Sequence, residues 1–211
     1  AFSSGPWASM TPTERGRCLR NLGDLLAVHS ESLGRTESVD TGKMLKETRW
    51  QAKYIAEFFH FYAGCADKIS GKTLPIDKPD LFVFTNREPL GVVAAIVPWN
   101  SQLFLVAVKL GPALAAGCGF VVRPAAETPF SALALAVLAE EAGIPAGVFN
   151  VITGKSRPIG AELTSNPTVR KLTFTGSTPV GKLLMQQCAP TLKKVSLELG
   201  GNAPFIVFDD A

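Results

Sequence analysis

The sequence predicts an α/β fold, a doubly wound parallel sheet preceded by a helical N-terminal segment. From residue 91 onward, short runs rich in β-branched residues alternate with helical stretches of about ten to fifteen residues. The short runs are apolar at successive positions, which is typical of parallel strands buried on both faces. Helices that connect such strands cover both faces, so the sheet is expected to be doubly wound.

Residues 1–71 are predicted to be a helical segment that packs on the sheet domain. Thr11-Pro12-Thr13-Glu14 has the form of a capping box, with proline at the first helical position. Leucines at helical spacing then mark one buried face: Leu19, Leu22, Leu25 and Leu26. Further helical stretches are expected at Glu37–Lys46 and from about Glu47 to Ala66. The aromatic residues of the last stretch are expected to pack in the core: Phe58, Phe59, Phe61 and Tyr62.

Residues 72–90 are predicted to be an extended connection and oligomerisation strand region, in which Asp80–Thr85 follows a proline-rich turn. Residues 91–211 are predicted to form the α/β domain, which we expect to be incomplete at its C-terminus. Its expected strands are Val92–Val97, Gly119–Arg123, Val148–Ile152, Lys171–Phe174 and Val195–Leu197, with Phe205–Phe208 as a further candidate. Its expected helices are Gln102–Ala116, Ser131–Ala142, Pro158–Thr164 and Pro179–Gln187.

The composition argues against nucleic-acid, membrane and metal sites. The net charge of +3 is small and dispersed, unlike a basic patch. The longest apolar stretches are too short to span a bilayer. The four cysteines form no C-x-x-C motif and there are only two histidines, so we expect no metal site. No secretory signal opens the chain, so we expect reduced cysteines and a cytoplasmic location.

Unusual residues gather where the predicted strands end. The segments concerned are Pro98-Trp99-Asn100, Arg123-Pro124-Ala125-Ala126-Glu127, Phe174-Thr175-Gly176-Ser177 and Glu198-Leu199-Gly200-Gly201. The carboxyl ends of parallel strands lie at one edge of a sheet, and ligands of doubly wound folds bind there. The sequence therefore predicts one ligand crevice lined by all four segments.

The segment Gly176–Lys182 matches the phosphate-loop pattern G-x-x-x-x-G-K between a strand and a helix. The next residue is Leu183, where a magnesium-binding serine or threonine is required, so a nucleotide triphosphatase is the weaker interpretation. A helix N-terminus that holds a pyrophosphate through its free N–H groups explains the same residues without magnesium. Ser177 would then be the N-cap or a phosphate donor, and Pro179 suits the first turn. The chain contains no G-x-G-x-x-G, so an ordinary Rossmann dinucleotide site is not indicated.

Taken together, these segments resemble the aldehyde dehydrogenase superfamily. The similarity runs essentially from end to end and is most specific in Pro98-Trp99-Asn100, Phe174-Thr175-Gly176-Ser177 and Glu198-Leu199-Gly200-Gly201. From about Thr128 to Ala211 the chain is similar to the succinate-semialdehyde dehydrogenase branch, whereas Pro98–Gly117 differs from it. The resemblance implies a Rossmann-like dinucleotide-binding domain and the oxidation of an aldehyde, with succinic semialdehyde as the first candidate.

The resemblance also implies residue roles. Asn100 would donate its side-chain N–H to the aldehyde oxygen as it becomes an oxyanion. Glu198 would be the general base that activates the water hydrolysing a thioester. The plainer interpretations are a helix cap for Asn100, an ordinary strand-end carboxylate for Glu198 and a core side chain for Trp99. The residues expected to bind the cofactor are Val97, Pro98, Trp99, Arg123, Ala125, Ala126, Gly160, Gly176, Ser177, Val180, Leu199 and Gly200. Lys109, in an otherwise apolar helix, is expected to extend its ammonium group to solvent.

Two departures from the family pattern concern the cofactor. Arg123 stands where the family usually has lysine, and Ala126 stands where many NAD-preferring members have glutamate. A carboxylate there would repel a 2′-phosphate, and an arginine can pair with one, so NADP is expected to be tolerated or preferred over NAD. The adjacent Glu127 could partly restore NAD binding.

The third departure concerns the nucleophile. Family members place a cysteine a few dozen residues beyond the glutamate base, but the residues after Glu198 include none. Cys188 is expected on the preceding helix and Cys118 at the amino end of a strand, away from the crevice. We therefore expect the catalytic domain to be absent from this chain and the chain alone to be inactive. The resemblance implies that the complete enzyme is a homodimer or homotetramer. The alternative function for this chain is a non-catalytic dinucleotide-binding module.

Overall fold

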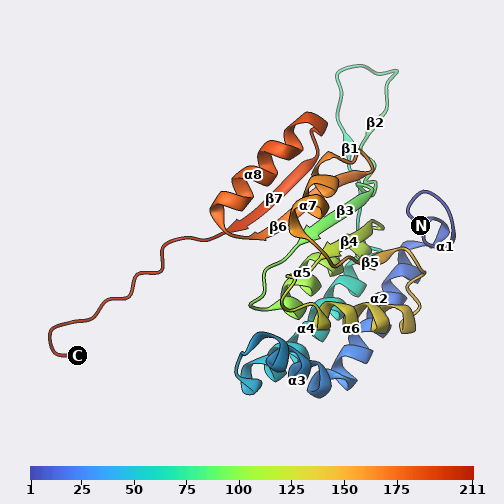
Figure 1. Ribbon diagram of the computed structural model, residues 1–211. Coiled ribbons are helices and arrows are strands. Elements are labelled where there is room, and N and C mark those ends of the chain that lie inside the picture. The colour runs from blue at the N-terminus through green and yellow to red at the C-terminus, as the bar shows by residue number, and fades with distance from the viewer.

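The computed structural model describes residues 1–211 and contains a five-stranded parallel sheet with helices on both faces (Figure 1). The strand order is β5-β4-β3-β6-β7, which confirms the predicted α/β fold. The strands are β3 (Val92–Ile96), β4 (Gly119–Arg123), β5 (Phe149–Val151), β6 (Val169–Gly176) and β7 (Lys194–Leu199). β3, β4 and β5 follow one another outward from the centre of the sheet. The chain then crosses back and adds β6 and β7 on the other side of β3. This reversal makes the carboxyl ends of β3 and β6 the switch point of the fold.

Two separate cores lie on the two faces of β3. Val93 and Ala95 belong to the larger core of 32 residues, whereas Ala94 belongs to a smaller core of seven. The larger core contains α5 (Gln102–Ala115) and α6 (Phe130–Glu141) together with the N-terminal helices. The smaller core contains α7 (Ser156–Ser165) and α8 (Thr178–Cys188). Successive strand residues point to opposite faces, so a continuously apolar strand feeds both cores.

The N-terminal helices are α1 (Pro6–Ser9), α2 (Pro12–Val28), α3 (Ser30–Thr41) and α4 (Leu45–Cys65). The capping box at Thr11 and Glu14 is confirmed, with both of its hydrogen bonds present. The helix predicted at Glu37–Lys46 was partly wrong, because α3 begins at Ser30 and ends at Thr41. Gly42 follows with φ 76°, a left-handed conformation that glycine adopts readily and that ends the helix. None of the helices is both long and apolar enough to cross a membrane.

The predicted core packing of the α4 aromatics is confirmed for Phe59 and for Tyr62, which is partly buried against the core, and is wrong for Phe61. Only Phe59 is fully buried, whereas Phe61 is 65% exposed. Phe58 is half-buried against Phe104 of α5, with ring centroids 5.6 Å apart. Four aromatics within five positions cannot share one face of a helix, so the helix presents some of them outward.

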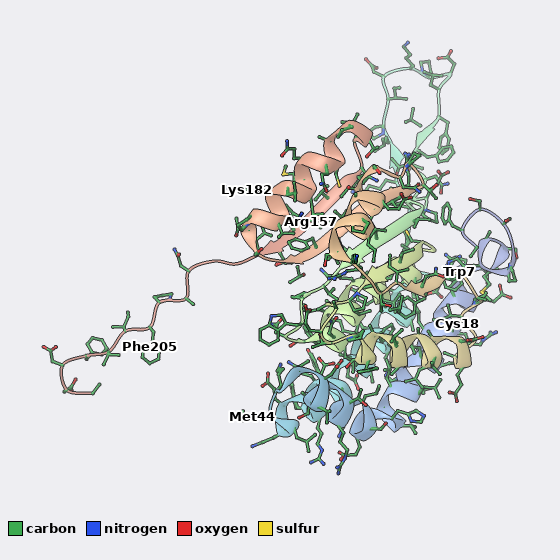
Figure 2. The ribbon with its side chains drawn as sticks, in the orientation of Figure 1. Trp7, Cys18, Met44, Arg157, Lys182 and Phe205 are labelled. Atoms are coloured by element: carbon green, nitrogen blue, oxygen red, sulfur yellow. The ribbon has the colours of Figure 1, made fainter.

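Two segments carry little regular structure. A short antiparallel pair, β1 (Thr73–Leu74) with β2 (Val83–Phe84), closes a hairpin in the connection between the helices and the sheet. Residues 200–211 extend away from the sheet, and Phe205 lies out on this extension (Figures 1 and 2). The strand predicted at Phe205–Phe208 was therefore wrong, because these residues pair with no strand and are exposed.

The α2–α4 contact depends on glycines in α2. A Cβ built on Gly16 would lie 2.8 Å from the Ala63 carbonyl oxygen, and one on Gly23 would lie 2.5 Å from the His60 ring. Backbone cannot move away as a flexible side chain can, so Gly16 sets how closely the two helices approach.

Buried Glu37 joins α3 to α5. Its side chain is 2% exposed, and Oε2 accepts the backbone N–H of Leu103 at 3.2 Å, near the start of α5. Burial raises the pKa of Glu37, while hydrogen bonding with Ser131 and Leu103 and the charge of Lys43 oppose that rise. The contact thus supplies an acceptor to a helix N-terminus from a residue distant in sequence.

We expect Gly16→Ala to lower the free energy of unfolding by about 1–3 kcal/mol, because the added methyl group forces α2 away from α4. Gly64→Ala in α4 is the matched control, since its Cβ would meet nothing within 4 Å. That variant should stabilise the chain by roughly 0.5–1 kcal/mol. Urea unfolding of both variants tests this, and equal stabilisation by the two would contradict the role of Gly16.

The raised pKa of Glu37 predicts a pH dependence of stability. The native chain retains this proton above its ordinary pKa of 4.5, where the unfolded chain has lost it. The stabilising contribution is therefore complete below about pH 4.5 and declines as the pH rises through the folded-state pKa. We expect the free energy of unfolding to decline less steeply with pH in Glu37→Gln than in the parent chain. Identical slopes would refute this, and the exposed Glu141→Gln serves as the control.

Candidate active site

Parallel pairing brings the four predicted segments to one edge of the sheet. Ile96 of β3 pairs with Arg123 of β4 on one side and with Phe174 of β6 on the other. Farther along, Thr175 of β6 pairs with Glu198 of β7. The segments that follow these residues therefore leave the sheet at the same edge. The strand ends that were predicted to line one crevice therefore share one edge of the sheet.

The first segment is the turn between β3 and α5. Val97 is buried, Pro98 is half-buried, and Trp99 is 57% exposed, which excludes the core interpretation of Trp99. Asn100 is exposed, and the N-cap position of α5 is occupied by Ser101 and not by Asn100. The capping interpretation of Asn100 therefore has no support, and its amide lies at the sheet edge.

The N-terminus of α8 has the form expected of an anion site. Ser177 is the N-cap residue, and its side chain makes no capping hydrogen bond. The Thr178 hydroxyl donates to the Gly200 carbonyl at 3.4 Å, which ties this turn to the segment after β7. A Cβ on Gly176 would lie 2.4 Å from the Phe174 ring, so a larger residue would not fit there. The free N–H groups of an 11-residue helix suit a pyrophosphate.

The end of β4 places a guanidinium beside the start of α7. Arg123 donates from a terminal nitrogen to the Ser156 hydroxyl at 2.6 Å, while its Nε is buried without a partner. Ala125 is buried and Ala126 is exposed, so a side chain added at Ala126 would project outward. Gly160 lies in α7 with open space where a Cβ would be. This corner therefore combines a positive charge with an accessible surface.

A groove of about 570 Å³ lies on the face of β6 and β7 that faces α5. Its polar lining residues are Lys109, Lys171, Thr173, Thr175, Ser196 and Glu198. Lys109 was predicted to extend to solvent, and that was wrong, because its Nζ donates to the Thr173 hydroxyl at 3.1 Å. Burial lowers the pKa of Lys109, and the charge of Glu198 raises it in part. The ammonium and the Glu198 carboxylate thus share one groove.

The two cysteines of the sheet domain lie away from this edge. Cys188 ends α8 and is 1% exposed, and burial raises the pKa of its thiol. Cys118 precedes β4 at the amino edge of the sheet and is also buried. A thiolate nucleophile must be accessible and close to the bound carbonyl, so neither residue suits that role.

Comparison with known proteins gives the same relationship along the whole chain. The aldehyde dehydrogenase family model matches residues 1–211. The chain is 53% identical over 205 residues to the succinate-semialdehyde dehydrogenase (NADP(+)) of Escherichia coli, covering 97% of this chain and 42% of that protein. It is 52% identical over 205 residues to the glutarate-semialdehyde dehydrogenase of Pseudomonas aeruginosa, with the same coverage.

Solved structures agree in fold. An aldehyde dehydrogenase from Brucella melitensis biovar abortus superposes with a TM-score of 0.92 at 54% identity, over 97% of this chain and 42% of that one. An NAD-dependent aldehyde dehydrogenase from Sinorhizobium meliloti gives a TM-score of 0.93 at 39% identity, over 97% and 41%. The chain therefore spans about two fifths of the length of these relatives. From the match of the family model to all of its residues, the chain belongs to the aldehyde dehydrogenase family.

Proposed function

We propose that this chain is the dinucleotide-binding part of an NAD(P)-dependent aldehyde dehydrogenase that oxidises an aldehyde to the carboxylic acid. The observation that carries the proposal is the parallel register, which gathers the segments after Ile96, Arg123, Gly176 and Leu199 at one edge. The strand ends contribute the Arg123 guanidinium and the Glu198 carboxylate, and the segments after them contribute an amide donor and an open helix N-terminus. Together these groups suit a dinucleotide and a carbonyl group.

The dinucleotide would lie across the ends of β3, β4 and β6. The α8 N-terminus, with Ser177 and Val180, would hold the pyrophosphate, and Arg123, Ala126 and Gly160 would border the adenosine end. Leu199 and Gly200 would allow backbone to approach the nicotinamide ribose. When bound, the nicotinamide accepts the hydride that leaves the substrate carbon.

Asn100 would stabilise negative charge on the aldehyde oxygen. Its exposed side chain precedes α5, so it can donate an N–H to an oxygen placed in the crevice. A donor of this kind is worth more in the transition state than in the ground state, because the oxygen gains charge during the reaction.

Glu198 would act as the general base. Its carboxylate is exposed in the groove that also holds the Lys109 ammonium. It would take a proton from the water that releases the acid from a cysteine thioester. The thiolate would come from sequence outside these 211 residues, so we expect no turnover by this chain alone.

The substrate is proposed to be a small aldehyde, with succinic semialdehyde the first to test, because several relatives carry semialdehyde dehydrogenase names. The complete enzyme is proposed to be a homodimer or homotetramer. The hairpin within residues 72–90 supports this, because Phe82 and Phe84 are exposed together on it with ring centroids 5.9 Å apart.

A non-catalytic dinucleotide-binding module is the competing function. It would bind the same ligand, so binding alone cannot separate the two. Turnover of an aldehyde by the full-length enzyme separates them, and a requirement for magnesium in binding would instead favour a triphosphatase.

We expect the chain to bind NADPH at least as tightly as NADH in the presence of EDTA, as measured by nucleotide fluorescence. Ala126→Glu should raise the Kd for NADPH about tenfold, because the new carboxylate repels the 2′-phosphate, while the Kd for NADH stays within twofold. Val39→Glu adds the same charge on α3 at a residue that is 88% exposed, and it should change neither constant. Binding of NADH far more tightly than NADPH would overturn the cofactor preference.

In the full-length enzyme, Asn100→Ala should lower kcat by about 10²–10³, the usual effect of removing an oxyanion donor. Glu198→Gln should block thioester hydrolysis, so a rapid first release of reduced cofactor is expected to be followed by slow turnover. Stopped-flow absorbance of the reduced nicotinamide measures both effects. Normal steady-state turnover in either variant would remove that residue from the proposed mechanism.

A further inference from the structure

The turn that carries Asn100 is fixed on both sides, although Asn100 itself is exposed. Hydrogen bonds reach the backbone or side chains of Trp99, Ser101, Gln102 and Leu103. A turn at the end of a strand can adopt several conformations unless other elements restrain it. Here the restraints come from three residues in two parts of the chain, the N-terminal helical layer and the segment after β4.

One restraint comes from the segment after β4. Gln102 is fully buried, and its Nε2 donates to the Thr128 hydroxyl at 2.9 Å. The same hydroxyl donates to the Trp99 carbonyl oxygen at a longer 3.5 Å. Thr128 therefore bridges the residue before Asn100 to a residue after it.

Two further restraints come from the N-terminal helical layer. Lys43 Nζ donates to the Ser101 hydroxyl at 3.0 Å and is itself held by Glu47 at 2.7 Å. Glu37 accepts the Leu103 N–H at 3.2 Å, as described above. Residues between 37 and 43 in the sequence thus hold the turn at residues 101–103.

Stability alone gives little reason for this arrangement. Oε1 of Gln102 is buried without a hydrogen-bond partner, although Gln102 is fully buried. An unpaired buried oxygen destabilises the folded state, and apolar side chains of similar volume would avoid that penalty. A partly satisfied polar network in a core is better explained by the conformation it specifies.

We propose that Lys43, Gln102 and Thr128, supported by Glu37, are positioning residues that fix the turn so that the Asn100 amide meets the aldehyde oxygen. The inference rests on the oxyanion role of Asn100 in the proposed function. These residues do not touch the substrate and act only through the placement of Asn100. Displacement of a catalytic donor by about 1 Å is enough to slow a reaction by as much as a hundredfold.

The test uses the full-length enzyme with Thr128→Val and Gln102→Met, which remove the polar atoms and nearly preserve volume. Each should lower kcat about tenfold or more, while the Kd for NADPH stays within twofold. Thr164→Val is the matched control, because Thr164 is equally buried on the other face of the sheet, where its hydroxyl contacts the Gly160 and Ala161 carbonyl oxygens and Gln187. The control should lower the melting temperature by a similar amount and leave kcat unchanged. Thr128→Ser keeps the hydroxyl and should restore most of kcat.

A double-mutant cycle with Asn100→Ala decides the mechanism. If the network acts through Asn100, Thr128→Val should cause no further loss of kcat in the Asn100→Ala enzyme. If Thr128→Val lowers kcat by the same factor in the Asn100→Ala enzyme as in the parent enzyme, the inference is overturned. It is also overturned if Asn100→Ala slows the enzyme but Thr128→Val and Gln102→Met leave kcat unchanged. No effect of Asn100→Ala itself would instead overturn the oxyanion role in the proposed function, and the inference would fall with it.

Discussion

The parallel pairing of β3 with both β4 and β6 is the constraint on which the rest of the structure depends. β3 has only five residues, yet it pairs with a strand on each edge and contributes side chains to both cores. Because the two pairings run in the same direction, everything that follows these strands emerges at one edge. A one-residue slip of β3 would move Ala94 into the larger core and Val93 and Ala95 into the smaller one, so the packing of the two different cores fixes the register and hence the site.

The two faces of the sheet are used differently. α7 and α8 pack on one face, and α8 begins at the carboxyl edge of the sheet, directly after β6. On the other face, α5 and the N-terminal helices cover β3 and β4, but the part over β6 and β7 is an open groove that contains Glu198 and Lys109. The proposed phosphate-binding and proton-transferring groups therefore lie on different layers that meet at the switch point.

Local patterns in the sequence predicted most of the sheet and the segments at its edge. The apolar runs located β3 and β4 within a residue, because burial on both faces leaves that pattern, and the shorter expected strand Lys171–Phe174 lies within β6. The prediction failed at Phe205–Phe208 and at Glu37–Lys46, for two different reasons. Phe205–Phe208 has strand composition but no neighbouring strand, and Glu37–Lys46 has helical residues on both sides of a glycine that ends the helix. The sequence alone does not show whether a glycine in a helical stretch lies inside the helix or ends it.

The contacts around Asn100 illustrate the same limit at the site. The spacing of Pro98-Trp99-Asn100 after an apolar strand was enough to place Asn100 at the sheet edge. Nothing in the sequence near Glu37, Lys43 or Thr128 indicated that they contact that turn, because the contacts join residues 26 to 66 positions apart. The position of Lys109 could not be predicted either. A lone lysine in an apolar helix is compatible with solvent exposure or with a buried polar partner, and in the structure it donates to Thr173 on β6. Side chains that bind a ligand leave a local signal at strand ends, whereas side chains that hold those residues in place are assigned only when the chain is folded.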